Sequence, residues 1–76
     1  MQHADREVDA RGLNCPLPIL RTRKAMAGLA AGEVLEVTAS DRGSVKDMES
    51  FYNQTGHQLL ASDQQDGAFV FRIRKG

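Results

Sequence analysis

Residues 7–18 read EVDARGLNCPLP and set the start of the fold. Two small apolar residues alternate with two acidic ones at the beginning of this stretch, which predicts a short strand over 7–10. Gly12 suits the turn that follows the strand. Proline is favoured in the first turn of a helix, because its missing N–H would have no partner there. The two prolines therefore predict a first helix over 16–27, with Cys15 at its N-cap.

Three further stretches have the pattern of strands. Residues 33–39 and 68–74 alternate apolar and polar side chains, which is typical of strands with one buried and one exposed face. A shorter strand is predicted over 57–62. The Asp66-Gly67 pair beyond it is a strong signal for the tight turn of a β-hairpin. The chain is therefore expected to end in two antiparallel strands.

A second helix is predicted between the second and third strands. Apolar residues recur at helical spacing after Ser44, Gly56 closes the segment, and Ser44 with Asp47 resembles a capping pair. The order is then strand, helix, strand, helix, strand, strand. Because crossovers between parallel strands are right-handed, both helices are expected to cover one face of a mixed four-stranded sheet. We expect an α/β fold of the two-layer α+β sandwich type, with the other sheet face open.

The length, charge and composition of the chain limit the kinds of protein that it can be. Seventy-six residues make a single domain over 1–76, with 1–6 expected to form a mobile tail. Ten Lys and Arg balance ten Asp and Glu, whereas a nucleic-acid binder is usually basic. One cysteine and two histidines argue against a structural zinc site, so no metal is expected. An apolar signal core and a membrane-spanning segment are both missing, so we expect a soluble cytoplasmic protein that contacts no membrane.

Cys15 is the only cysteine, so no disulfide can form within the chain. The thiolate is the reactive form of cysteine, and the positive end of a helix dipole stabilises an anion. The pKa of the Cys15 thiol is therefore expected to lie below its usual range. The two flanking prolines lack N–H groups, which leaves Leu17 and Ile19 to donate toward the sulfur. One exposed nucleophilic sulfur suggests a protein that accepts and passes on one group; the alternative is a buried cysteine acting as a small hydrophobic residue.

The surroundings of the sulfur can be predicted in part. Asp41 is expected to share its rim, because parallel first and second strands end at the same sheet edge, although a turn or cap role is the alternative. Leu17 and Leu20 fall outside the apolar stripe of the first helix, which comprises Ile19, Thr22, Met26 and Leu29. If exposed, they form an apolar docking patch rimmed by Arg21, Arg23 and Lys24. Otherwise Leu20 packs at the core edge and the cations are solvated surface. His57 is expected to be a structural or surface histidine.

Residues 9–18 resemble the hallmark of the TusA family of small sulfur carriers, also called SirA-like. The hallmark reads Gly-Leu-x-Cys-Pro-x-Pro and is met by Gly12, Leu13, Cys15, Pro16 and Pro18. The resemblance spans nearly the whole chain and implies a βαβαββ sandwich similar to the C-terminal domain of translation initiation factor 3. Relatives often have an acidic residue in place of Leu17 and proline in place of Arg42, so the branch of the family stays open.

The resemblance also implies a function. Cys15 carries sulfur as a persulfide, received from a cysteine desulfurase or a rhodanese and passed to an acceptor protein. Destinations in such relays include 2-thiolation of the tRNA wobble uridine, molybdenum cofactor biosynthesis and sulfur oxidation, and some relatives are linked to selenium. The transient persulfide is the only cofactor implied, and the protein is expected to be a monomeric carrier rather than an enzyme with turnover.

Two other functions stay open at this point. A nucleic-acid-binding or regulatory domain would show salt-sensitive RNA binding that survives Cys15→Ala. A one-cysteine thiol enzyme would need a base or an arginine beside the sulfur and would turn over without a partner.

Overall fold

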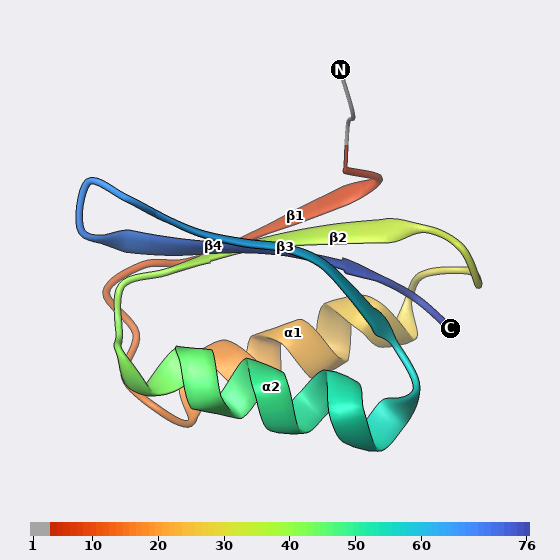
Figure 1. Ribbon diagram of the computed structural model, residues 1–76, viewed down its shortest axis with the longest axis horizontal. Helices are drawn as coiled ribbons and strands as arrows, with labels where there is room; N and C mark the ends of the chain where they lie inside the picture. Colours follow the sequence, from red (N-terminus) through yellow and green to blue (C-terminus); the bar gives the residue numbers. More distant parts are fainter. Residues whose placement is uncertain (1–3) are drawn as a thin grey trace.

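The elements follow the predicted order in a computed structural model that describes residues 4–76. Figure 1 shows the four strands in one layer and both helices packed against the same face of that layer. This confirms the predicted two-layer α+β sandwich. The elements are β1 (Arg6–Ala10), α1 (Leu17–Ala27), β2 (Val34–Ala39), α2 (Gly43–Thr55), β3 (Gln58–Gln65) and β4 (Ala68–Arg74).

The sheet has the strand order β1-β2-β4-β3. β1 and β2 are parallel, whereas β4 runs antiparallel to both β2 and β3, so the sheet is mixed as predicted. Ala10 pairs with Ala39 in the parallel register. Because these two residues end their strands, the loops that lead into α1 and α2 start side by side at one edge of the sheet.

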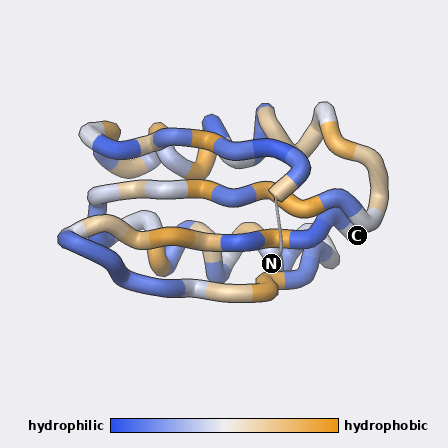
Figure 2. Tube along the Cα trace, turned by 90° about the horizontal axis from the view of Figure 1, so that it is seen from above, coloured by the Kyte–Doolittle hydropathy of each residue, from blue (hydrophilic) through white to orange (hydrophobic). Residues whose placement is uncertain are grey.

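The core lies between the sheet and the helices. Figure 2 looks onto the sheet from the side opposite the helices, and hydrophilic and hydrophobic segments alternate along the strands. The alternation buries the inward side chains of β2 and β4 and the facing side chains of the helices; the fully buried large ones include Leu35, Val37, Met48, Phe71 and Ile73. From the predicted stripe of α1, Thr22, Met26 and Leu29 are buried, whereas Ile19 is only half-buried.

The first helix begins one residue later than predicted. Pro16 is the N-cap residue, and its carbonyl accepts a hydrogen bond from the Leu20 N–H at 3.2 Å. The prediction that Cys15 is the N-cap is therefore wrong, because this bond makes Pro16 the residue that starts the helical pattern. Cys15 lies just outside the helix, joined to Pro16 by a cis peptide bond.

The second helix begins at Gly43, with Arg42 as its N-cap. The predicted Ser44–Asp47 capping pair is wrong, because the buried Ser44 donates its hydroxyl to the backbone carbonyl of Asp41 instead. The helix ends at Gly56, which adopts the left-handed conformation with φ 77°. This end of the helix agrees with the sequence prediction.

The hairpin strand β3 is longer than predicted and runs to Gln65. Its last residues are polar and exposed, so they lack the apolar alternation that marks a strand, yet they pair with β4 along the sheet edge. Asp66 and Gly67 form the turn with φ values of 49° and 80°, the geometry that favours two-residue hairpin loops.

The chain is ordered closer to its start than predicted. Asp5 donates its N–H to the Val34 carbonyl at 2.8 Å, and its carboxylate accepts the Val34 N–H. Arg6 already belongs to β1. The expected tail over 1–6 therefore excludes these two residues, and 1–3 lie outside the described part of the chain. No helix within residues 4–76 is long and apolar enough to cross a membrane.

Candidate functional site

Cys15 lies at the sheet edge where β1 and β2 end, and its side chain is exposed. The loop that carries it is tied to the loop after β2, because the Gly12 N–H donates to Ser40 Oγ at 2.8 Å. Leu13 anchors the same loop by packing against the core. Cys15 is therefore not a buried cysteine acting as a small hydrophobic residue. Its sulfur lies on an exposed loop that these contacts hold in place, at the sheet edge called the rim below.

Two carboxylates hold the cysteine. The backbone N–H of Cys15 donates to Asp41 Oδ2 at 2.8 Å, and the thiol Sγ donates to Asp47 Oδ2 at 2.9 Å. Asp41 precedes α2 and Asp47 lies within it, so both acceptors come from the same side of the cysteine. The structure thus brings Asp41 beside Cys15, as the shared sheet edge predicted.

Gly43 allows this close approach. A Cβ added at Gly43 would lie 3.2 Å from Asp41 Oδ2 and 3.5 Å from the Cβ of Cys15. A side chain here would therefore press on the carboxylate that accepts the Cys15 N–H. Gly43 and Asp47 were both missed as site residues by sequence reasoning. The signal that could have found them is their four-residue spacing, which puts them on one face of α2 at the rim that Asp41 already marked.

The pKa of the Cys15 thiol is raised, chiefly by its hydrogen bond to Asp47. Desolvation and the negative charges of Asp47 and Asp41 act in the same direction. The predicted lowering of this pKa by the helix end is therefore wrong, because the Asp47 carboxylate accepts a hydrogen bond from the thiol and favours its protonated form. The Leu17 N–H, expected to point toward the sulfur, donates to the Asn14 carbonyl at 2.8 Å.

The two prolines of the motif differ in their surroundings. Pro16 is exposed beside the cysteine, whereas Pro18 is almost completely buried in the first turn of α1. The Pro18 carbonyl also accepts a hydrogen bond from the buried Thr22 hydroxyl at 2.9 Å. Pro18 therefore fixes the start of α1 onto the core, a packing role that the sequence did not reveal.

An apolar patch lies on α1 next to the cysteine. Leu17 is 45% exposed and Leu20 is 52% exposed, so Leu20 does not pack at the core edge. Arg21 and Lys24 are exposed on the same helix face, since residues three and four apart are neighbours on a helix. Leu17, Leu20, Arg21 and Lys24 are called the docking patch below. Arg23 points elsewhere, because its guanidinium lies 5.4 Å from the ring centre of Phe51 on α2.

His57 contacts other groups than the sulfur. His57 packs against Phe51 with ring centres 5.4 Å apart, and its Nδ1 accepts the Gly76 N–H at 3.0 Å. Burial, and then the charge of Lys75, lower the pKa of His57. These contacts give His57 a structural role. Within residues 4–76, no group of three or more His, Cys, Asp or Glu side chains could hold a metal ion.

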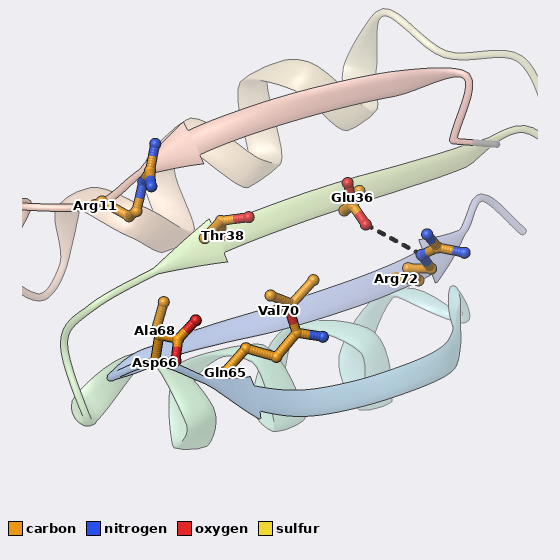
Figure 3. A pocket seen from close by; sticks show the side chains of 8 residues that line it. All are labelled: Arg11, Glu36, Thr38, Gln65, Asp66, Ala68, Val70 and Arg72. Carbon is orange, nitrogen blue, oxygen red and sulfur yellow. Dashed lines mark hydrogen bonds and ion pairs between the residues drawn. The ribbon is translucent and has the colours of Figure 1, made fainter.

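A groove of about 500 Å³ lies on the open face of the sheet, on the side opposite the helices (Figure 3). Glu36 and Arg72 form an ion pair across it, with 3.1 Å between Oε1 and Nε. The lining residues are Arg11, Glu36, Thr38, Gln65, Asp66, Ala68, Val70 and Arg72. Cys15 is not among them, so the groove and the thiol are separate features of the surface.

Comparison with known proteins points to one family along the whole chain. The family model described as Sulfurtransferase TusA matches residues 6–75. A sulfur carrier protein TusA of Allochromatium vinosum is 51% identical over 75 residues, covering 99% of each chain. A putative sulfur carrier protein of Neisseria meningitidis serogroup A is 49% identical over 67 residues, covering 88% of this chain and 90% of the relative.

A solved structure gives the same result for the fold. The crystal structure of a SirA-like protein from Desulfitobacterium hafniense matches with a TM-score of 0.84 at 30% sequence identity, covering 93% of this chain and 97% of the other. The matched region contains the cysteine motif, both helices and all four strands. This chain therefore belongs to the TusA family of sulfur carrier proteins.

Proposed function

We propose that Cys15 carries one sulfane sulfur as a persulfide between two protein partners. The observation that carries this proposal is the exposure of the chain's only cysteine at the rim. In the loading step, the Cys15 sulfur attacks the outer sulfur of a donor persulfide. The bond between the two donor sulfurs breaks, the donor's inner sulfur leaves as a thiol, and a new sulfur–sulfur bond forms on Cys15. No external oxidant or reductant is consumed.

The absence of a second cysteine protects the persulfide on Cys15 from attack within the chain. A second thiol close by would attack the persulfide, release the outer sulfur and leave a disulfide. The 76 residues contain no second cysteine, so no thiol of the same chain can displace the sulfur. The carrier requires no resident cofactor on this view, because the persulfide is its cargo and the partners supply the chemistry.

The proposed partners are those that membership of the TusA family implies. The donor is a cysteine desulfurase or a rhodanese, and the acceptor is a protein of a sulfur relay in the cytoplasm. Candidate destinations are tRNA thiolation, molybdenum cofactor synthesis and sulfur oxidation. The docking patch suits a partner surface with an apolar pocket bordered by acidic residues, because it combines two exposed leucines with two cations. The balanced charge argues against stable nucleic-acid binding. The proposed carrier acts as a monomer.

Intact-mass analysis tests the proposal. The protein is incubated with a cysteine desulfurase and cysteine, or with a rhodanese and thiosulfate. A gain of one sulfur atom is expected with at least one donor, reversible by a thiol reductant and absent in Cys15→Ser. Failure to gain sulfur from either donor, or an equal gain on Cys15→Ser, would overturn it. Salt-sensitive RNA binding that survives Cys15→Ala would instead support a nucleic-acid-binding role.

A further inference from the structure

We propose that Asp47 is a positioning residue that acts in opposite senses on the empty and the loaded carrier: it restrains the bare Cys15 thiol and turns the outer sulfur of the persulfide toward the partner. This inference rests on the proposed persulfide function. It is carried by the 2.9 Å hydrogen bond from Cys15 Sγ to Asp47 Oδ2 and by the position of Asp41 on the Cys15 N–H.

In the empty carrier, Asp47 favours the protonated thiol. The S–H group donates to the carboxylate, so ionisation would replace a hydrogen bond by two negative charges at the same distance. Asp41 adds a second negative charge on the same side of the sulfur. Among the described residues, these two carboxylates are the charged groups that act on the thiol. The bare sulfur is therefore less reactive while its hydrogen bond to Asp47 is in place.

In the loaded carrier, the same hydrogen bond cannot form. The Sγ atom of a persulfide is bonded to Cβ and to the outer sulfur, so it has no hydrogen to donate. The outer sulfur ionises more readily than a thiol and carries negative charge at neutral pH. Asp47 and Asp41 repel this charge, so the outer sulfur is expected to point away from α2 and into solvent. Asp47 thus lowers the reactivity of the thiol in the empty carrier and directs the outer sulfur toward solvent in the loaded carrier.

The burial of Asp47 supports a fixed role. Asp47 is partly buried on α2, whereas Glu49 on the same helix is exposed. Glu49 contributes nothing to the pKa shift of Cys15. Asp47→Asn and Glu49→Gln therefore form a matched pair, because each removes one negative charge from α2 and only the first removes it from the sulfur.

The first measurement is the rate at which iodoacetamide alkylates the empty carrier at pH values from neutral to alkaline. Asp47→Asn is expected to react severalfold faster than the native protein at neutral pH, with a profile shifted to lower pH. Glu49→Gln is expected to match the native profile. An unchanged or slower reaction of Asp47→Asn, or an equal acceleration in Glu49→Gln, would overturn the inference.

The second measurement uses carrier loaded from a small-molecule persulfide, so that no donor protein is needed. Cyanide removes the outer sulfur as thiocyanate, and this reaction is expected to be severalfold slower in Asp47→Asn, because the asparagine amide can hold the outer sulfur against α2. Rates that change in the same direction for the empty and the loaded carrier would contradict the proposal, since general loosening of the rim predicts that result. If the native protein forms no persulfide at all, the proposed function fails instead.

A folding control accompanies both measurements. Thermal unfolding shows whether Asp47→Asn keeps the native fold. If it does not, Asp47→Glu retains the negative charge and serves as the second variant. Asp47→Glu is expected to keep the slow alkylation of the native thiol, and a fast reaction in a folded Asp47→Glu would contradict the role of the charge.

Discussion

At the scale of single residues, the reactivity of Cys15 is set by groups far away in the chain. Asp41 and Asp47 lie 26 and 32 positions beyond it and reach it only through the parallel pairing of β1 with β2. The local motif predicted a lowered thiol pKa from the helix end. The carboxylates reverse that direction, because Asp47 accepts a hydrogen bond from the thiol itself and Asp41 adds a second negative charge nearby.

Asp9, beside the motif, offers a test of the electrostatics of this rim. Hydrogen bonds from the Arg11 side chain and backbone lower the pKa of the Asp9 carboxyl to about 2. The folded-state pKa lies below the ordinary value of 3.8, so the pair favours folding above that pH and its contribution disappears as the pH falls toward 2.

An NMR titration of the side-chain carboxyl groups measures this shift. Asp9 is expected to titrate near pH 2 in the native protein and closer to 3.8 in Arg11→Gln, because the variant loses the charged side-chain hydrogen bonds. An Asp9 midpoint that is the same in both proteins would show that Arg11 does not hold the carboxylate.

At the scale of elements, α1 combines an anchored start with an exposed face. Pro18 and Thr22 fix its first turn to the core, and the docking patch lies on the opposite side of the helix. Helical spacing predicted most of the buried stripe, but it did not reveal the burial of Pro18. A proline in the first turn was fully explained by its missing N–H, so the sequence offered no reason to expect a packing role as well.

Pro18→Ala is expected to lower the free energy of unfolding by about 1.5 kcal/mol, because it removes two buried ring methylenes. Urea denaturation followed by circular dichroism measures the change. Leu17→Ala, at the exposed neighbouring position, is the control and is expected to cost less than about 0.5 kcal/mol. Equal losses for the two variants would argue against an anchoring role for Pro18.

The docking patch makes a separate prediction for α1. Leu20→Asp is expected to slow loading from a cysteine desulfurase by about tenfold, since it places an unpaired charge in an apolar contact, and about 1.4 kcal/mol of lost binding is a tenfold change. Loading from a small-molecule persulfide is expected to be unchanged. Gln64→Asp, on the exposed end of β3, adds the same charge away from the patch and is expected to behave like the native protein.

Rates from both donors can be followed by intact mass. If Leu20→Asp slowed the small-molecule reaction as much as the enzymatic one, the leucine would support Cys15 itself rather than a partner. If it slowed neither, the donor would dock elsewhere.

At the scale of the whole molecule, the sequence predicted the structure best where a residue pattern is compatible with only one kind of element. The alternation in 33–39 and 68–74 predicted β2 and β4 with the correct buried faces, and the Asp66-Gly67 pair predicted the hairpin. The order of elements then led to the parallel pair and to the two-layer arrangement. The cysteine motif added the family, which the comparisons confirm.

The sequence was least informative about polar side chains that have more than one possible hydrogen-bond partner. Ser44 and Asp47 fitted a capping pair, but one bonds to the Asp41 carbonyl and the other to the Cys15 sulfur. The end of β3 was missed because an exposed edge strand requires no apolar residues. These choices depend on contacts between loops and helices, which spacing along a single chain does not determine.

The central claim is that the whole molecule presents one transferable sulfur on one cysteine. Quantitative cyanolysis of the loaded protein measures this directly, because cyanide converts a persulfide into a thiol and thiocyanate. We predict one thiocyanate per chain, the return of the native mass after the reaction, and none from Cys15→Ser. Sulfur that stays bound after cyanide treatment, or thiocyanate released from Cys15→Ser, would contradict the claim.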